Sequence, residues 1–165
     1  MYGTVEGYKA YHLARGNDIP ASSDTDIAEG LLVASEWLDG RYRIGFGGLK
    51  VGGRDQVREW PRSGAMDIYG YAVASDSVPR EVEYATYEAA AKQLAVPGSL
   101  SVDFVPSKYK RASVDGAVSV EWAGYTSAVE VQTQFAIIDQ ILAPLLVGNP
   151  AFPASSMFSG TAERV

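Results

Sequence analysis

The sequence predicts a mainly helical α+β fold: a small bundle of about four helices with one β-hairpin and an extended C-terminal tail. Apolar side chains recur every three or four residues in four segments, as on the buried face of a helix. One pair, Asp115-Gly116, lies between two alternating segments, which is typical of a hairpin. Pro150 and Pro153 exclude a regular element from the tail. The helices are expected over residues 5–15, 24–43, 79–96 and from about 133.

The first helix has a capping residue at its start and a glycine at its end. Thr4 is expected to cap it, and Gly16 to end it in a left-handed turn. Tyr8, Tyr11 and His12 fall near one face. We therefore expect His12 to be a packed histidine rather than a catalytic base.

The second helix has the clearest pattern. Ser23 precedes several acidic residues, which favour the positive N-terminal end of a helix. Trp37 widens the apolar stripe that follows, so we expect it to have a structural role in the core. The stripe repeats at i, i+4, i+7, i+11 and i+15 and consists of Ile27, Leu31, Ala34, Leu38 and Tyr42.

Prolines mark the two ends of the third helix and a break in the last one. Pro79 stands at an expected first helical position, and Pro97-Gly98 ends that helix. Its acidic residues, Glu88 included, are attributed to the positive end of the helix. The last helix is expected to start near Thr133 and to kink or restart at Pro144. Its predicted inner side comprises Phe135, Ile138, Ile141, Leu142 and Leu145.

Residues 45–59 contain five glycines and are expected to form a flexible loop. Lys50 stands where the third glycine of a dinucleotide-binding fingerprint would be, so a phosphate site is not expected. Trp60 precedes Pro61 and should be extended. We expect Trp60 and Pro61 to have a structural role, fixing the exit of the loop against the core.

Composition narrows the possible functions. The chain has 165 residues, the size of one domain, and 14 basic against 20 acidic residues give a net charge of −6. It has no cysteine and one histidine, which excludes a thiolate metal site, a cysteine nucleophile and a His-rich metal cluster. No motif for a metal, a cofactor or an active site can be named in the sequence, so we expect a binding or structural protein without metal or cofactor. No apolar run approaches the roughly 20 residues that span a bilayer, so no membrane partner is expected. The acidic balance disfavours general nucleic-acid binding.

The predicted hairpin, within about 100–123, carries the basic cluster of the chain. Its members are Lys108, Tyr109, Lys110 and Arg111. Along a strand, Lys108 and Lys110 would share one face and Arg111 would lie on the other. The cluster is either a solvated strand or a contact to a nucleic-acid backbone.

We expect residues 1–147 to form the helical domain and residues 148–165 to form the extended tail. The tail contains Phe152, Met157 and Phe158, which a purely solvated tail would not need. It either orders on a partner or is a frayed terminus. These three residues, the hairpin 108–122 and the loop 45–56 are the candidate interfaces.

Five short blocks of the sequence form a recognisable series: Ala10–Gly16, Ala34–Tyr42, Trp60–Gly64, Val78–Arg80 and Ile141–Leu146. In this order they resemble a phage family labelled DnaT-like single-stranded-DNA-binding protein, which is similar to head-to-tail adaptor proteins, also called head-completion or connector proteins. The resemblance covers roughly residues 2–147. The blocks with Trp-Pro-Arg and Leu-Asp-x-Arg-Tyr carry most of its specificity.

The resemblance implies a structural protein of the virion neck, made in the host cytoplasm and without enzymatic activity. It implies a ring, usually a dodecamer, that sits beneath the portal protein and continues the channel for DNA ejection toward the tail. Its implied partners are the portal protein, neighbouring copies and a downstream tail or neck protein, with double-stranded DNA passing without sequence recognition. In that family the C-terminal segment commonly docks on the portal.

The alternative is the function in the family's label, a single-stranded-DNA-binding accessory protein. It would use Lys108, Tyr109, Lys110 and Arg111 through phosphate contacts and base stacking. An enzyme whose active site is assembled only by the tertiary structure is a third, residual possibility.

Overall fold

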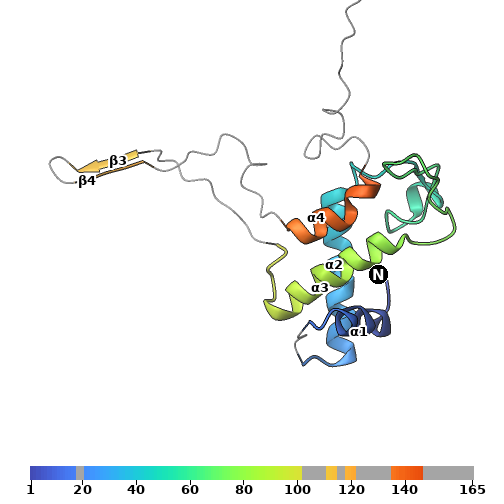
Figure 1. Cartoon of the computed structure of the whole chain (residues 1–165), viewed down its shortest axis with the longest axis horizontal. Helices are drawn as coiled ribbons and strands as arrows, with labels where there is room; N and C mark the ends of the chain where they lie inside the picture. Colours follow the sequence, from blue (N-terminus) through green and yellow to red (C-terminus); the bar gives the residue numbers. More distant parts are fainter. Residues whose placement is uncertain (18–20, 102–110, 115–117, 122–134, 147–165) are drawn as a thin grey trace, which may run out of the picture.

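A computed structural model describes residues 1–17, 21–101, 111–114, 118–121 and 135–146, and it confirms the mainly helical α+β class (Figure 1). Short strands and single 3₁₀ turns complete the described part. The helices are α1 (Val5–Ala14), α2 (Asp24–Tyr42), α3 (Arg80–Ala95) and α4 (Ala136–Leu142). Strands β1 (Leu49–Lys50) and β2 (Arg62–Ser63) pair antiparallel, as do β3 (Arg111–Val114) and β4 (Val118–Glu121). The 3₁₀ turns are η1 (Gly53–Asp55) and η2 (Ala143–Leu145).

Helix α2 follows the sequence prediction closely. The Ser23 hydroxyl accepts a hydrogen bond from the Asp26 N–H at 3.2 Å, and the Asp26 carboxylate accepts one from the Ser23 N–H at 2.9 Å. This reciprocal capping box fixes the start of the helix. The whole predicted stripe from Ile27 to Tyr42 is buried. Trp37, at the edge of the stripe, is partly buried against the core.

Helix α3 packs against both α2 and α4 (Figure 1). It begins at Arg80, so Pro79 is the capping residue and not the first helical residue as predicted. A Cβ added to Gly30 of α2 would lie 3.1 Å from Leu94 of α3, so the glycine permits a close approach of the two helices. The buried side of α3 is wide and consists of Val82, Ala85, Thr86, Tyr87, Glu88, Ala89 and Ala90.

Helix α1 is capped at both ends as predicted. The Thr4 hydroxyl accepts a hydrogen bond from the Gly7 N–H at 3.0 Å, and Gly16 has a φ of +64°. His12 is buried, with Nε2 3.3 Å from the carbonyl oxygen of Tyr87. The prediction of a packed histidine is confirmed.

Helix α4 begins at Ala136, later than predicted, and Thr133 lies outside the described residues. Pro144 restarts the chain as the 3₁₀ turn η2, one of the two predicted outcomes. Ile138 and Leu142 are buried against the bundle. The Tyr42 hydroxyl donates a hydrogen bond to the Asp139 carboxylate and so ties α2 to α4.

The predicted hairpin is present as β3 and β4, and Figure 1 shows it apart from the helices. Val114 pairs with Val118, so three residues separate the last pair, not the predicted two. The turn itself lies outside the described residues, as do residues 102–110 of the range predicted for the hairpin and the whole tail 148–165. The boundary between domain and tail therefore stays a prediction.

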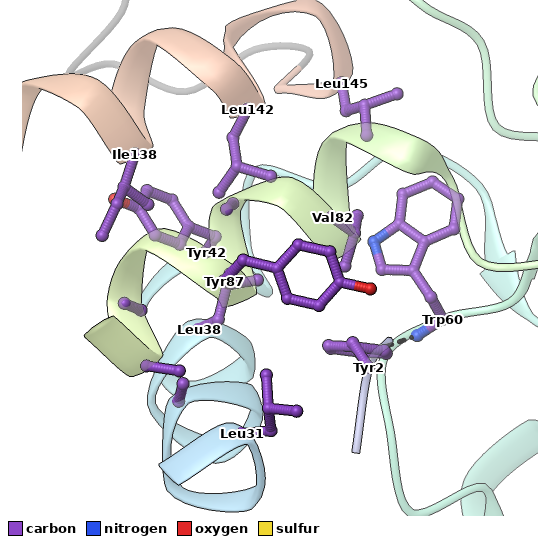
Figure 2. Packing of buried hydrophobic residues seen from close by; sticks show 14 of the residues in the cluster. Tyr2, Leu31, Leu38, Tyr42, Trp60, Val82, Tyr87, Ile138, Leu142 and Leu145 are labelled. Carbon is purple, nitrogen blue, oxygen red and sulfur yellow. Dashed lines mark hydrogen bonds between the residues drawn. The ribbon is translucent and has the colours of Figure 1, made fainter. Parts of the chain in front are cut away.

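The core mixes aliphatic side chains with buried tyrosines whose hydroxyls need partners (Figure 2). Tyr2 donates to Asp39 at 2.5 Å and Tyr11 donates to Glu88 at 2.9 Å. Glu88 is therefore a buried acceptor near the middle of α3, and attributing it to the positive end of the helix is wrong. These bonds join segments that are far apart in the sequence.

Candidate functional site

The glycine-rich segment, which the sequence predicts to be a flexible loop, is closed by the antiparallel pair β1 and β2. Leu49 is opposite Ser63, and Lys50 is opposite Arg62. Gly48 has a φ of +69°, and a Cβ there would collide with the Ser63 carbonyl oxygen. Glycine at this position therefore permits the close approach of the two chain segments.

The guanidinium of Arg62 holds the loop from inside. It donates to the carbonyl oxygens of Gly47 at 2.7 Å and Gly48 at 2.8 Å. It also forms an ion pair with the Glu59 carboxylate at 2.8 Å. Only 7% of Arg62 is exposed, so these bonds offset the cost of burying its charge.

A second set of bonds closes the tip of the loop. The Lys50 ammonium donates to the Gln56 carbonyl oxygen at 2.7 Å. The Gln56 amide accepts from the Gly52 N–H at 2.8 Å and donates to the carbonyl oxygen of Pro61 at 3.0 Å. Gln56 thereby connects both sides of the loop.

The loop is clamped to α2 through a buried carboxylate, Asp39. Arg58 contacts Asp39 at 3.5 Å and Glu36 at 3.1 Å. The Tyr2 hydroxyl, which donates to Asp39, also accepts the Trp60 backbone N–H at 3.1 Å (Figure 2). Burial raises the pKa of Asp39, and its bonds to Tyr2 and Arg58 partly oppose that shift.

Trp60 anchors the exit of the loop in the core. It is 2% exposed, and its ring meets Phe46 edge to face at 5.4 Å. The Trp60-Pro61 peptide bond is cis, and Pro61 is partly buried. These positions agree with the structural role expected for both residues.

The outside of this segment is rich in exposed apolar side chains. Of the fourteen large apolar residues exposed in the described part of the chain, eight fall within residues 44–71. Ile44 and Val57 are 91% and 88% exposed. We call the eight residues the loop surface: Ile44, Leu49, Val51, Val57, Met66, Ile68, Tyr69 and Tyr71.

The loop surface has the chemistry of a protein contact. Aromatic residues and methionine are enriched where proteins meet, and exposed apolar side chains concentrated in one segment are candidates for such a contact. Among the described residues, no group of three or more metal-ligating side chains comes together. None of the helices that the structure describes is long and apolar enough to cross a membrane.

Cations in the described part of the chain are mostly engaged with its own acids or aromatic rings. Lys9 pairs with Asp24, and Arg80 lies 3.7 Å from Glu81. The Arg15 guanidinium lies 3.5 Å from the centre of the Tyr11 ring. Such cations are less available to neutralise nucleic-acid phosphates.

The sequence-predicted contact residues lie largely outside the described residues. This is so for the tail anchors Phe152, Met157 and Phe158 and for Lys108, Tyr109 and Lys110. Arg111 is the first residue of β3, where its backbone pairs with Glu121.

Sequence reasoning listed the loop 45–56 as an interface candidate but missed what organises it. In the sequence, Arg62 stands out only as part of the block Trp60–Gly64, and Tyr2 belongs to no pattern. The signal that pointed here was the Trp-Pro-Arg sequence that follows the glycine-rich segment 45–59.

Comparison with known proteins places the whole chain in one family. No curated protein and no solved structure matches it. A family model matches residues 1–165. Its description names single-stranded DNA binding, as the alternative expectation does, and does not name a virion neck protein. The chain therefore belongs to the family described as "Putative DnaT-like ssDNA binding protein".

Proposed function

We propose that this protein is a structural head-to-tail adaptor of a phage virion, without enzymatic activity, and that copies of it form a ring beneath the portal protein. The observation that supports it most is the loop surface. A hydrogen-bonded frame holds this segment, yet its outside presents apolar side chains to solvent. A rigid apolar exterior suits a subunit that is completed by protein partners.

The proposed partners are neighbouring copies, the portal protein and a downstream tail or neck protein. A ring uses two different surfaces of each subunit, because the contact is head to tail. The tail 148–165, with Phe152, Met157 and Phe158, is the proposed anchor on the portal. The net charge of −6 suits a ring that lets double-stranded DNA pass without holding it.

The description of the family favours a second function, a single-stranded-DNA-binding accessory protein. The basic cluster from Lys108 to Arg111 would then contact phosphates, and Tyr109 would stack on a base. Two observations weigh against it: the acidic net charge, and the engagement of most described cations with this chain's own groups.

The location of the protein tests the adaptor function. Purified virions should contain the chain in mass spectrometry, and cryo-electron microscopy should place its copies on the head–tail axis beneath the portal. Virions without the chain, or copies away from that axis, would contradict the proposal.

Removing residues 149–165 tests the proposed anchor. The truncated chain should no longer co-purify with the portal, whereas the full chain should. The truncation leaves every described helix intact, so circular dichroism checks that the bundle is still folded. Unchanged portal attachment would remove the tail from the proposal.

Binding to a fluorescent oligonucleotide separates the two functions. The accessory protein should bind single strands at micromolar concentration, and its affinity should fall steeply with salt. Neutralising Lys108, Lys110 and Arg111 with glutamine should then abolish binding, while Arg80→Gln, a matched exposed cation on α3, should not. The adaptor should show no such binding.

A further inference from the structure

The two ends of α2 carry opposite charge. The described residues among positions 1–30 include two basic and four acidic residues, a formal charge of −2. Residues 31–71, which include the whole loop surface, contain six basic and five acidic residues, a formal charge of +1. Figure 1 shows α1 near the N-terminal end of α2, and the loop that contains β1 and β2 follows its C-terminal end. The charges therefore separate along the long axis of this helix.

Exposed charged groups and exposed apolar side chains are both present at each end of α2. At the acidic end, Glu6 and Glu29 are exposed, and Leu13 of α1 is 82% exposed. At the other end, Arg43, which directly precedes Ile44 in the chain, and Arg54 are exposed. Each end thus offers an apolar contact together with charges that the other end complements.

The exposed apolar side chains decide what kind of partner this loop fits. Ile44, Leu49 and Val57 gain nothing from phosphates, and they require an apolar surface that excludes water. Two loop cations, Arg58 and Arg62, are already bound to carboxylates of this chain. An acidic protein surface with apolar side chains fits these features, and the α1 end of the same chain has both.

We propose that the loop surface of one copy docks head to tail on the acidic end of α1 and α2 in the next copy. Such a contact uses different surfaces on its two sides, so it can propagate and close into a ring. This inference rests on the adaptor function and adds to it the two faces that meet. Complementary charges would steer the contact and make its strength depend on salt.

Self-association of the full chain tests the proposal. Sedimentation velocity up to about 1 mM protein at low salt should show concentration-dependent dimers and larger species. Raising the ionic strength from about 0.1 M to about 1 M shortens the screening length from about 10 Å to about 3 Å and should weaken association. A chain that stays monomeric, or that associates independently of salt, would overturn the inference.

Each of the two proposed faces can be removed by a double variant, and the first removes the loop surface. Ile44→Ser with Val57→Ser should weaken association about tenfold or more, because both side chains are almost fully exposed in the monomer. Val96→Ser, an exposed valine after α3, is the matched control and should not change it. Thermal melts should show all these variants folded.

Mixing two variants, each of which lacks a different face, gives the most direct test. Glu6→Lys with Glu29→Lys should abolish association from the other face. A mixture of the two double variants should still form a 1:1 dimer, because each retains the face that the other lacks. No dimer in the mixture, or undiminished association of either variant alone, would exclude the head-to-tail contact.

Three outcomes separate a failure of the inference from a failure of the proposed function. If the Ile44 and Val57 variant loses oligonucleotide binding but associates normally, the loop is a nucleic-acid surface and the inference fails. Copies found beneath the portal, together with normal association of both variants, would reject the inference and leave the adaptor function standing. Virions that lack the chain would reject the function itself.

Discussion

Replacing Arg62 with methionine should destabilise the protein by about 3–5 kcal/mol, the cost of breaking a buried ion pair by removing one partner. Methionine keeps much of the length but removes the bonds to the Gly47 and Gly48 carbonyl oxygens and to Glu59. Each bond that involves a charged group contributes about 1.5–3 kcal/mol. Since Glu59 is only 15% exposed, water would compensate little of this loss.

Urea denaturation followed by tryptophan fluorescence measures the effect, because Trp60 lies in the core directly beside this frame. Arg54→Met is the matched control: Arg54 is exposed, and its change should stay within about 0.5 kcal/mol. Arg62→Lys should recover only part of the loss, since an ammonium lacks the planar fork of donors. If Arg62→Met unfolded at the same urea concentration as the wild type, the frame would not support the fold.

Three further predictions follow from the buried residues. Leu38→Ala should cost about 2–5 kcal/mol in urea unfolding, since Leu38 is fully buried in α2. Gly48→Ala should lower the melting temperature, because its φ of +69° disfavours alanine and the added Cβ meets backbone. Burial, with hydrogen bonds to carboxylates, raises the pKa of Tyr2, Tyr11 and Tyr42. The folded state then retains protons that the unfolded state loses, so the free energy of unfolding should fall above about pH 10, and less steeply in Tyr42→Phe.

Helix positions could be predicted because their signals are local. The stripe of α2 recurs within a few residues, and Ser23 and Asp26 form their capping box over a single turn. The hairpin signal at Asp115-Gly116 is equally local, and β3 and β4 pair on either side of it. Pro144 could be placed at a break for the same reason.

The candidate site could be predicted only in outline, because its contacts join distant parts of the chain. Tyr2 bonds to Asp39, which is 37 residues away, and Tyr42 bonds to Asp139, which is 97 residues away. Neither of these separations corresponds to a repeat that can be recognised in a sequence. Arg62 reads as an ordinary surface cation until β1 and β2 bring the loop carbonyls around it. Glycines alone predicted flexibility and missed the frame that orders this segment.

In the loop, the residues that support the fold differ from the residues proposed to contact a partner. The proposed contact can therefore be tested with variants that leave the stability of the monomer unchanged. Arg62 and Trp60 face inward, where any change alters the free energy of unfolding. Ile44 and Val57 face solvent, so polar substitutions there remove apolar area that the monomer does not bury. A loop that served only the fold would gain nothing from apolar side chains at these outer positions. A variant that keeps full stability but loses association therefore reports on the partner surface alone.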